Sequence, residues 1–133
     1  MSVFVDTSAF YALLDEDDDH HIEAVQVWRR LGERLTPLVT SNYVVVETTA
    51  LLQARLGMLA VRCFADALLL PVEMFFVDNG THARAVAAHR TAGRPRLSLV
   101  DCASFEVMRR LGQEEAFAFD DHFTQQGFRC CAA

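Results

Sequence analysis

The sequence predicts an α/β fold, a three-layer αβα sandwich with a central, mainly parallel sheet of four to five strands. Short apolar runs rich in β-branched and aromatic residues alternate with helical segments throughout, without a repeat or linker. Such alternation is typical of parallel strands covered by helices on both faces. A length of 133 residues, 52% of them hydrophobic, suits one domain with a substantial core. We therefore expect residues 1–133 to form a single domain.

The first strand is expected at residues 3–5, an apolar run that stops abruptly at Asp6. Thr7 and Ser8 are suitable N-cap residues for a helix over residues 9–14. The carboxyl end of a strand is where α/β sheets bind ligands. Asp6 is therefore a candidate site residue, although the same position also suits an acid that only caps or turns the chain.

An amphipathic helix is predicted over residues 18–35, after an acidic loop. Acids at its start are favoured by the helix dipole, and Gly32 weakens its end. Its apolar stripe is expected to comprise Ile22, Val25, Trp28 and Leu31.

A second strand at residues 37–40 leads through the cap residues Ser41 and Asn42 to a helix over residues 43–56. Its first valines also suit a strand, but the length of the segment favours a helix that ends at Gly57. The remaining elements are helices over residues 58–70, 81–91 and 98–111 and strands over residues 73–77, 116–119 and 128–130.

The composition indicates a soluble, cytoplasmic protein with no membrane association. No apolar run approaches the roughly 20 residues of a membrane span, and the N-terminus lacks signal-peptide order. The four cysteines include an adjacent pair and no CxxC spacing, so we expect free thiols in a reducing compartment. The formal charge of -6 argues against generic nucleic-acid binding, although the acidic run at residues 15–19 dominates it. Every basic residue is Arg, which either serves bidentate recognition or reflects the base composition of the gene.

Four acids occupy positions that an α/β sheet brings to one edge. Asp6 and Asp120 end strands, whereas Glu47 and Asp101 lie near helix starts. These positions can meet at the C-terminal crevice of the sheet. Carboxylates without basic partners repel one another, and Mg²⁺ or Mn²⁺ relieves that repulsion through oxygen ligands.

Each acid also has a purely local explanation. Asp101 completes the capping-box spacing with Ser98, Asp120 can cap a final helical turn, and Glu47 can be a solvated helical residue. Asp78 also ends a strand, but it is followed by Asn-Gly, which suits a plain turn. We therefore place Asp78 outside the site.

The four acids lie within a larger pattern of five short segments, which is defined by the order and spacing of their residues. They are Val5-Asp6-Thr7-Ser8-Ala9, Asp18-x-x-His21-x-x-Ala24, Val45-Val46-Glu47-Thr48, Leu97-Ser98-x-x-Asp101-x-x-Ser104 and Ala118-Phe119-Asp120-x-His122-Phe123. Together they span residues 5–123, nearly the whole chain. In this arrangement the sequence resembles the PIN-domain nucleases, especially the VapC-type toxins of bacterial VapBC toxin–antitoxin systems.

The resemblance implies a PIN-like homodimer that hydrolyses RNA phosphodiesters with water activated by one or two Mg²⁺ or Mn²⁺ ions. The implied metal ligands and catalytic residues are Asp6, Glu47, Asp101 and Asp120. The implied supporting residues are Thr7, Ser8 and Asp121, with Ser8 near the metal or the scissile phosphate. The histidines at positions 20, 21 and 122 are expected to pack or face solvent, because hard cations prefer oxygen ligands.

Substrate and partner surfaces follow from the same resemblance. Arg94 and Arg96 precede the helix at Ser98, and we hypothesise that they contact RNA phosphates; the alternative is that they are solvated loop cations. Apolar residues around Trp28 and over residues 51–70 exceed one core-facing stripe. They are expected to serve the homodimer and a groove for the antitoxin, unless they complete the core.

Two other functions stay open from the sequence: a PIN-like nuclease for RNA processing or DNA outside a toxin pair, and a non-catalytic Mg²⁺-binding signalling or binding domain. A receiver-type signalling domain ordinarily needs a paired acid near the first strand and a late Lys, and this chain has no Lys. A haloacid-dehalogenase-like phosphatase needs a second Asp where Ser8 stands.

Overall fold

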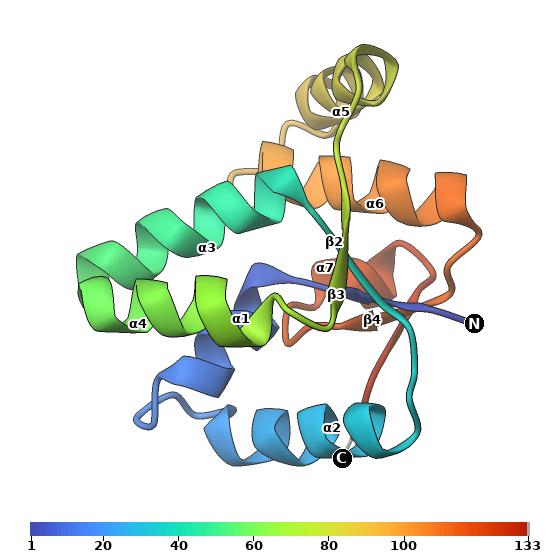
Figure 1. Cartoon of the computed structure of the whole chain (residues 1–133). Coiled ribbons are helices and arrows are strands. Elements are labelled where there is room, and N and C mark those ends of the chain that lie inside the picture. Colours follow the sequence, from blue (N-terminus) through green and yellow to red (C-terminus); the bar gives the residue numbers. More distant parts are fainter. Residues whose placement is uncertain (133) are drawn as a thin grey trace.

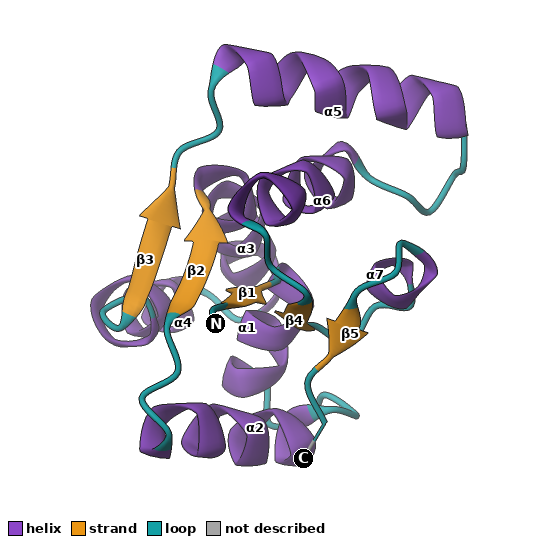
Figure 2. Cartoon of the chain, turned by 90° about the vertical axis from the view of Figure 1, so that its right-hand side faces the viewer, coloured by secondary structure: helices purple, strands orange, loops and turns teal. Residues whose placement is uncertain are grey.

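The computed structural model describes residues 1–132 and contains one sheet of five parallel strands in the order β3-β2-β1-β4-β5 (Figure 2). The strands are β1 (Val3–Val5), β2 (Leu38–Ser41), β3 (Val72–Phe75), β4 (Glu115–Phe117) and β5 (Arg129–Cys130). Every residue of β1 is buried, as expected for a central parallel strand covered on both faces.

Helices connect the strands and form the two outer layers (Figure 1). They are α1 (Thr7–Leu14), α2 (His21–Glu33), α3 (Asn42–Arg55), α4 (Met58–Cys63), η1 (Phe64–Leu68), α5 (Asn79–Ala92), α6 (Leu99–Leu111) and α7 (His122–Gln125). In both views α2 lies on one side of the sheet and α6 on the other, and α5 packs against α6. The predicted αβα sandwich is therefore confirmed. No helix within residues 1–132 is both long and apolar enough to cross a membrane.

Aromatic contacts hold together the elements that carry the strand ends. Phe10 meets Phe64 edge-on at 4.9 Å between ring centroids, which joins α1 to η1. Phe105 meets Phe123 in the same way at 5.1 Å, which joins α6 to α7. Because full burial of a large apolar side chain stabilises the fold by about 1.5–3 kcal/mol, these pairs fix the helix positions around the sheet.

The helix α1 begins earlier, and the helix α2 later, than the sequence predicts. α1 begins at Thr7 because Asp6 is its N-cap and accepts a hydrogen bond from the Ser8 N–H. α2 begins at His21, and its buried stripe comprises Ala24, Val27 and Leu31. The prediction that Ile22 belongs to the stripe is wrong. At 3.6 residues per turn it lies about 200° around the helix from Ala24, and it is 74% exposed.

Two later segments also differ from the predicted pattern. The single helix expected over residues 58–70 is divided into α4 and the π-helical η1, which opens with the fully buried Phe64. Asp78 is not part of a plain turn but the N-cap of α5, because its carboxylate accepts a hydrogen bond of 2.8 Å from the Thr81 N–H. α5 therefore begins at Asn79, earlier than predicted.

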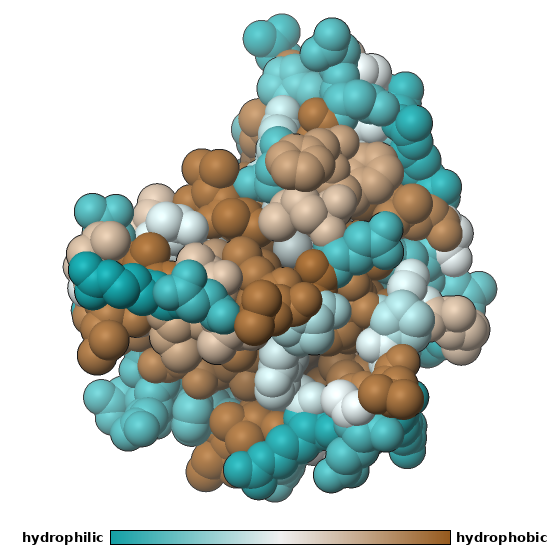
Figure 3. Space-filling view, in the orientation of Figure 1, coloured by the Kyte–Doolittle hydropathy of each residue, from teal (hydrophilic) through white to brown (hydrophobic). Residues whose placement is uncertain are grey.

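The apolar segment over residues 51–70 divides between the core and the surface. Leu52 and Phe64 are fully buried, whereas Met58 and Leu59 on α4 and Leu70 beyond η1 are exposed. Figure 3 shows apolar side chains gathered over the side of the molecule where α3 and α4 lie. Part of this segment therefore completes the core, and the rest is free to meet a partner.

Candidate acidic metal site

A cleft of about 490 Å³ opens at the carboxyl ends of the central strands, and all four predicted acids line it. Asp6 follows β1, Glu47 lies in the second turn of α3, Asp101 lies in the first turn of α6, and Asp120 lies between β4 and α7. A cleft of about 520 Å³ at the opposite edge also has two arginines in its lining but only two acids, Glu114 and Glu115, whereas the first cleft has five acids. The concentration of acids therefore distinguishes the cleft at the C-terminal edge.

Asp6 is the most deeply buried of these acids, with an exposed fraction of 4%. Its Oδ2 accepts hydrogen bonds from the Ser8 N–H at 3.1 Å and from the Ser8 hydroxyl at 2.7 Å. Burial raises the pKa of the Asp6 carboxyl from 3.8 to about 7; repulsion by Asp101 and Glu47 adds to the rise, and the Ser8 hydrogen bonds oppose it. The negative charge of an ionised Asp6 is thus not balanced by a cationic side chain within residues 1–132.

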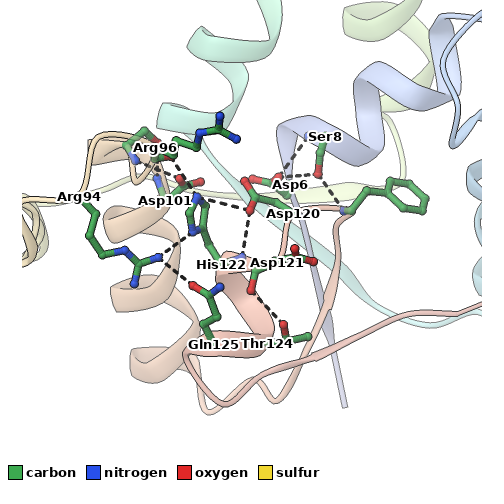
Figure 4. A network of polar contacts seen from close by, with 12 residues as sticks. Asp6, Ser8, Arg94, Arg96, Asp101, Asp120, Asp121, His122, Thr124 and Gln125 are labelled. Carbon is green, nitrogen blue, oxygen red and sulfur yellow. Dashed lines mark hydrogen bonds and ion pairs between the residues drawn. The ribbon is translucent and has the colours of Figure 1, made fainter.

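Two hydroxyl groups connect this acid to the neighbouring elements. The Phe119 N–H donates to Ser8 Oγ at 3.0 Å, so Ser8 links the start of α1 to the chain just before Asp120 (Figure 4). The Thr48 hydroxyl donates to Thr7 Oγ1 at 3.0 Å, which ties α1 to α3 beside Glu47. The predicted supporting residues Thr7 and Ser8 therefore fix the relative positions of three acids.

Asp101 and Glu47 are also destabilised as anions. Asp101 is 7% exposed, and its Oδ2 accepts a hydrogen bond of 3.0 Å from the Ser98 N–H in the predicted capping box. Burial raises the pKa of the Asp101 carboxyl, and the charge of Asp120 adds to the rise. Burial likewise raises the pKa of Glu47, with the Thr7 hydroxyl acting in the opposite direction. Three acids of the cleft thus favour protonation or a bound cation.

His122 holds Asp120 and the loop before α6 together (Figure 4). The His122 N–H donates to Asp120 Oδ1 at 2.9 Å. Its Nε2 lies 3.0 Å from the Arg96 carbonyl oxygen, which can only accept, so Nε2 carries a proton. Nδ1 then accepts from Arg94 Nη2 at 3.1 Å. Possible metal-ligand atoms of Asp101, Asp120 and His122 lie within 4.8 Å of one another. The hydrogen bonds to Arg96 and Arg94, however, already use both imidazole nitrogens of His122.

The two predicted substrate-binding arginines have different environments. Arg94 donates to His122 and, at 2.8 Å, to Gln125 Oε1, and it does not line the acidic cleft. Arg96 lines the cleft and forms no ion pair within the described part of the chain. Asp121, the predicted assisting acid, is exposed and also lies outside the cleft lining.

The cleft contains further residues that the sequence analysis did not select. They are Tyr11, Asp18, His20, Leu51, Arg55 and Phe119. Helical spacing could have identified two of them, because Glu47, Leu51 and Arg55 recur every four residues on one face of α3. The neighbouring face, Val44, Thr48 and Leu52, is the buried one. No local signal identifies His20, which comes from a loop.

The donor set fits a hard divalent cation. Asp6, Asp101 and Asp120 each use one carboxylate oxygen in hydrogen bonds to backbone N–H groups, and the second oxygen makes no hydrogen bond among residues 1–132. Oxygen ligands of this kind suit Mg²⁺ or Mn²⁺ better than a softer metal. The fold and the cleft together define the class: an α/β protein with a possible acidic metal site at the C-terminal edge of a parallel sheet.

Comparison with known proteins identifies the family within this class. Residues 3–129 match the PIN domain. The chain is 35% identical over 127 residues to the 23S rRNA-specific endonuclease VapC20 of Mycobacterium tuberculosis, covering 95% of both chains. The chain therefore belongs to the PIN-domain family, and it is an endoribonuclease of the VapC toxin type, as the sequence predicts.

Solved structures agree with this assignment. The crystal structure of M. tuberculosis VapC20, described as a sarcin–ricin loop cleaving toxin, superposes with a TM-score of 0.87 at 33% identity and covers 99% of this chain and 100% of that one. VapBC2 from Rickettsia felis, bound to a promoter DNA fragment, gives a TM-score of 0.72 at 10% identity, with 98% of each chain covered. The second likeness concerns the fold alone.

Proposed function

We propose that this protein cleaves ribosomal RNA of the large subunit, with the sarcin–ricin loop as its target, and that residues 1–133 form the single domain that does so. The observation that carries the proposal is the similarity to VapC20 over 95% of both chains, joined to a cleft that contains all four predicted acids.

In this proposal Asp6, Glu47, Asp101 and Asp120 hold Mg²⁺ or Mn²⁺. Within residues 1–132 no cationic side chain forms an ion pair with the first three of them, so the cleft has unbalanced negative charge. A bound ion would lower the pKa of a coordinated water and stabilise charge on the departing oxygen. The Ser8 hydroxyl orients the Asp6 carboxylate, and Thr7 restrains α3 beside Glu47.

Arg96 is the residue that we propose to bind an RNA phosphate at the cleft. It lines the cleft and has no acidic partner in the described residues, whereas Arg94 is engaged with His122 and Gln125. Arg94 therefore positions the loop through His122, which accepts from Arg94 and donates to the Arg96 carbonyl. Asp121 contributes charge from outside the cleft.

We also propose a homodimer and an antitoxin partner. The support is the exposed apolar surface around Met58, Leu59 and Leu70 and an apolar hollow of about 340 Å³ lined by Trp28, Leu31 and Pro71 among others. Fold neighbours of the chain include VapBC complexes. A neighbouring gene for a small DNA-binding protein, and co-purification of the two products as one complex, would support the antitoxin assignment.

The decisive experiment incubates the protein with a sarcin–ricin loop hairpin RNA and with a hairpin of equal length and scrambled loop sequence. Mg²⁺, Mn²⁺ and EDTA are compared. We expect cleavage of the first RNA at one site, dependence on the divalent ion, and loss of cleavage in the Asp6→Asn variant. Cleavage of both hairpins alike would exclude the proposed target, and cleavage in EDTA would exclude the metal.

Asp78→Asn is the matched control for Asp6→Asn. Asp78 also caps a helix after a strand, but it lies outside the cleft, is exposed and pairs with Arg110 at 2.6 Å. Asparagine caps helices as well as aspartate does, so this variant should retain full activity.

For Arg96→Ala we expect a higher KM for RNA. The slope of log Kd against log salt concentration should fall by about one charge. Arg90 on α5 is exposed, and Arg90→Ala is the control.

A further inference from the structure

Two stacked rings form part of the wall of the acidic cleft. The imidazole of His20 and the ring of Phe119 lie parallel, with centroids 4.5 Å apart and an interplanar angle of 7°. Both residues line the same cleft as the four acids. Phe119 directly precedes Asp120 in the chain, so the stack lies immediately beside the proposed metal site.

Backbone hydrogen bonds hold both ends of this stack in place. The Phe119 N–H donates to Ser8 Oγ at 3.0 Å, and Ser8 in turn donates to Asp6. The His20 N–H donates to Asp18 Oδ1 at 2.9 Å. Phe119 also meets Phe117 edge-on at 5.9 Å between ring centroids. The stack thus rests on the core at one end and is preorganised relative to the acids.

The His20 end of the stack is open. His20 is exposed, and its ring nitrogens form no hydrogen bond or ion pair within residues 1–132. The other two histidines near the site are committed: His21 Nδ1 lies 2.7 Å from the Ala12 carbonyl oxygen, and His122 bonds to Arg94 and Arg96. An uncommitted aromatic ring, held parallel to a second ring at a nuclease cleft, is suited to stacking.

We propose that the His20–Phe119 pair is a platform on which an unpaired nucleobase next to the scissile phosphate stacks. The proposal rests on the proposed cleavage of RNA. Proteins recognise loops in RNA by splaying bases out onto aromatic side chains, and such stacking tolerates any base because every base has a π-face. The platform fixes the nucleotide beside the metal site, while the acids and Arg96 engage its phosphate.

The test is a double-mutant cycle between the protein ring and the base. Each nucleotide flanking the cleavage site is replaced in turn by an abasic one, and KM and kcat are measured for wild type, His20→Ala and His20→Trp. In wild type, one abasic position should raise KM about tenfold or more. His20→Ala should raise KM for intact RNA by a similar factor and abolish the abasic penalty at that position, and His20→Trp should restore both.

A merely structural role would give a different pattern. If the abasic penalty were the same in His20→Ala as in wild type, the platform would be excluded, even if the variant were less active. His89→Ala, in a histidine on α5 away from the cleft, is the matched control and should behave as wild type.

A second measurement separates the platform from the proposed cleavage. RNAs with 2-aminopurine at each position of the hairpin loop in turn are bound to Asp6→Asn with and without His20→Ala, and fluorescence quenching reports stacking without any cleavage. Quenching that depends on His20 supports the platform even if the wild type cuts no RNA, which would overturn the proposed function alone. Binding without such quenching overturns the platform.

Discussion

Replacement of Asp6 by Asn should stabilise the metal-free protein, and the gain should grow with pH. The folded protein keeps the Asp6 carboxyl protonated up to about pH 7, whereas the unfolded chain releases the proton near pH 3.8. Between these values the folded state binds the extra proton, so the free energy of unfolding falls as pH rises and levels off above about pH 7. The neutral Asn side chain lacks this dependence.

The magnitude follows from the pKa shift. Each pH unit of the window corresponds to about 1.36 kcal/mol, and the last unit counts for less because the Asp6 carboxyl is already half ionised near pH 7, so from pH 5 to pH 7 the wild type loses about 2 kcal/mol relative to Asp6→Asn. Hydrogen bonds between Asn and Ser8 contribute equally at every pH. They therefore do not affect the comparison, which concerns only how the free energy of unfolding changes with pH. Relief of repulsion on Asp101 and Glu47 acts in the same direction.

Urea unfolding in EDTA at pH 5, 6, 7 and 8 measures this difference, with Asp78→Asn as the control. The pKa of Asp78 is lowered to about 2 by its hydrogen bonds to Thr81 and Arg110. Its stabilising effect is therefore fully present above pH 5, and the effect of Asp78→Asn should be constant over this range. A difference between Asp6→Asn and wild type that stays flat from pH 5 to pH 8 would refute the assignment of an uncompensated buried carboxyl.

Three further perturbations have defined outcomes. Mg²⁺ or Mn²⁺ at about 100 times its Kd should raise the free energy of unfolding by about 2.7 kcal/mol at pH 8, and calorimetry should show weaker binding at pH 5 because protons compete for the carboxylates. Ser8→Ala should destabilise the protein by about 1–3 kcal/mol in urea unfolding, since the Phe119 N–H loses its partner. Gly112→Ala should lower the free energy of unfolding by about 1 kcal/mol, because Gly112 ends α6 at φ 68°. Gly32→Ala within α2, where a Cβ meets no atom within 4 Å, should raise it by roughly 0.5–1 kcal/mol. Changes of the same sign in the two variants would contradict the backbone argument.

The fold was predictable because local and global signals agree. The run Val3–Val5 is apolar on both sides, and the structure places it at the centre of the sheet. Ser98 and Asp101 form the capping box that their spacing predicts. Ile22 and the π-helical turn at Phe64 were not predictable in this way. Their environments depend on how a helix docks on the core, which tertiary packing decides.

The location of the acids was predictable from topology alone, because strand ends and helix starts share one edge of a parallel sheet. The loop contacts were not. Arg94 and His122 meet across 28 residues of sequence, and His20 meets Phe119 through loops that carry no periodic signal. The position of Arg94 and Arg96 before α6 suggested the same RNA contact for both, whereas their environments differ once the loop is folded.

The local and functional explanations of the acids are compatible. Asp6 caps α1, Asp101 completes the capping box of α6, and Asp120 accepts the His122 N–H at the start of α7. Each of these hydrogen bonds uses one carboxylate oxygen and thereby fixes the rotamer, so the second oxygen is directed without further loss of side-chain entropy. Three helix starts at one sheet edge then present three preoriented oxygens. Cap-like spacing is therefore no evidence against a metal ligand, because the cap supplies the orientation that a cation site requires.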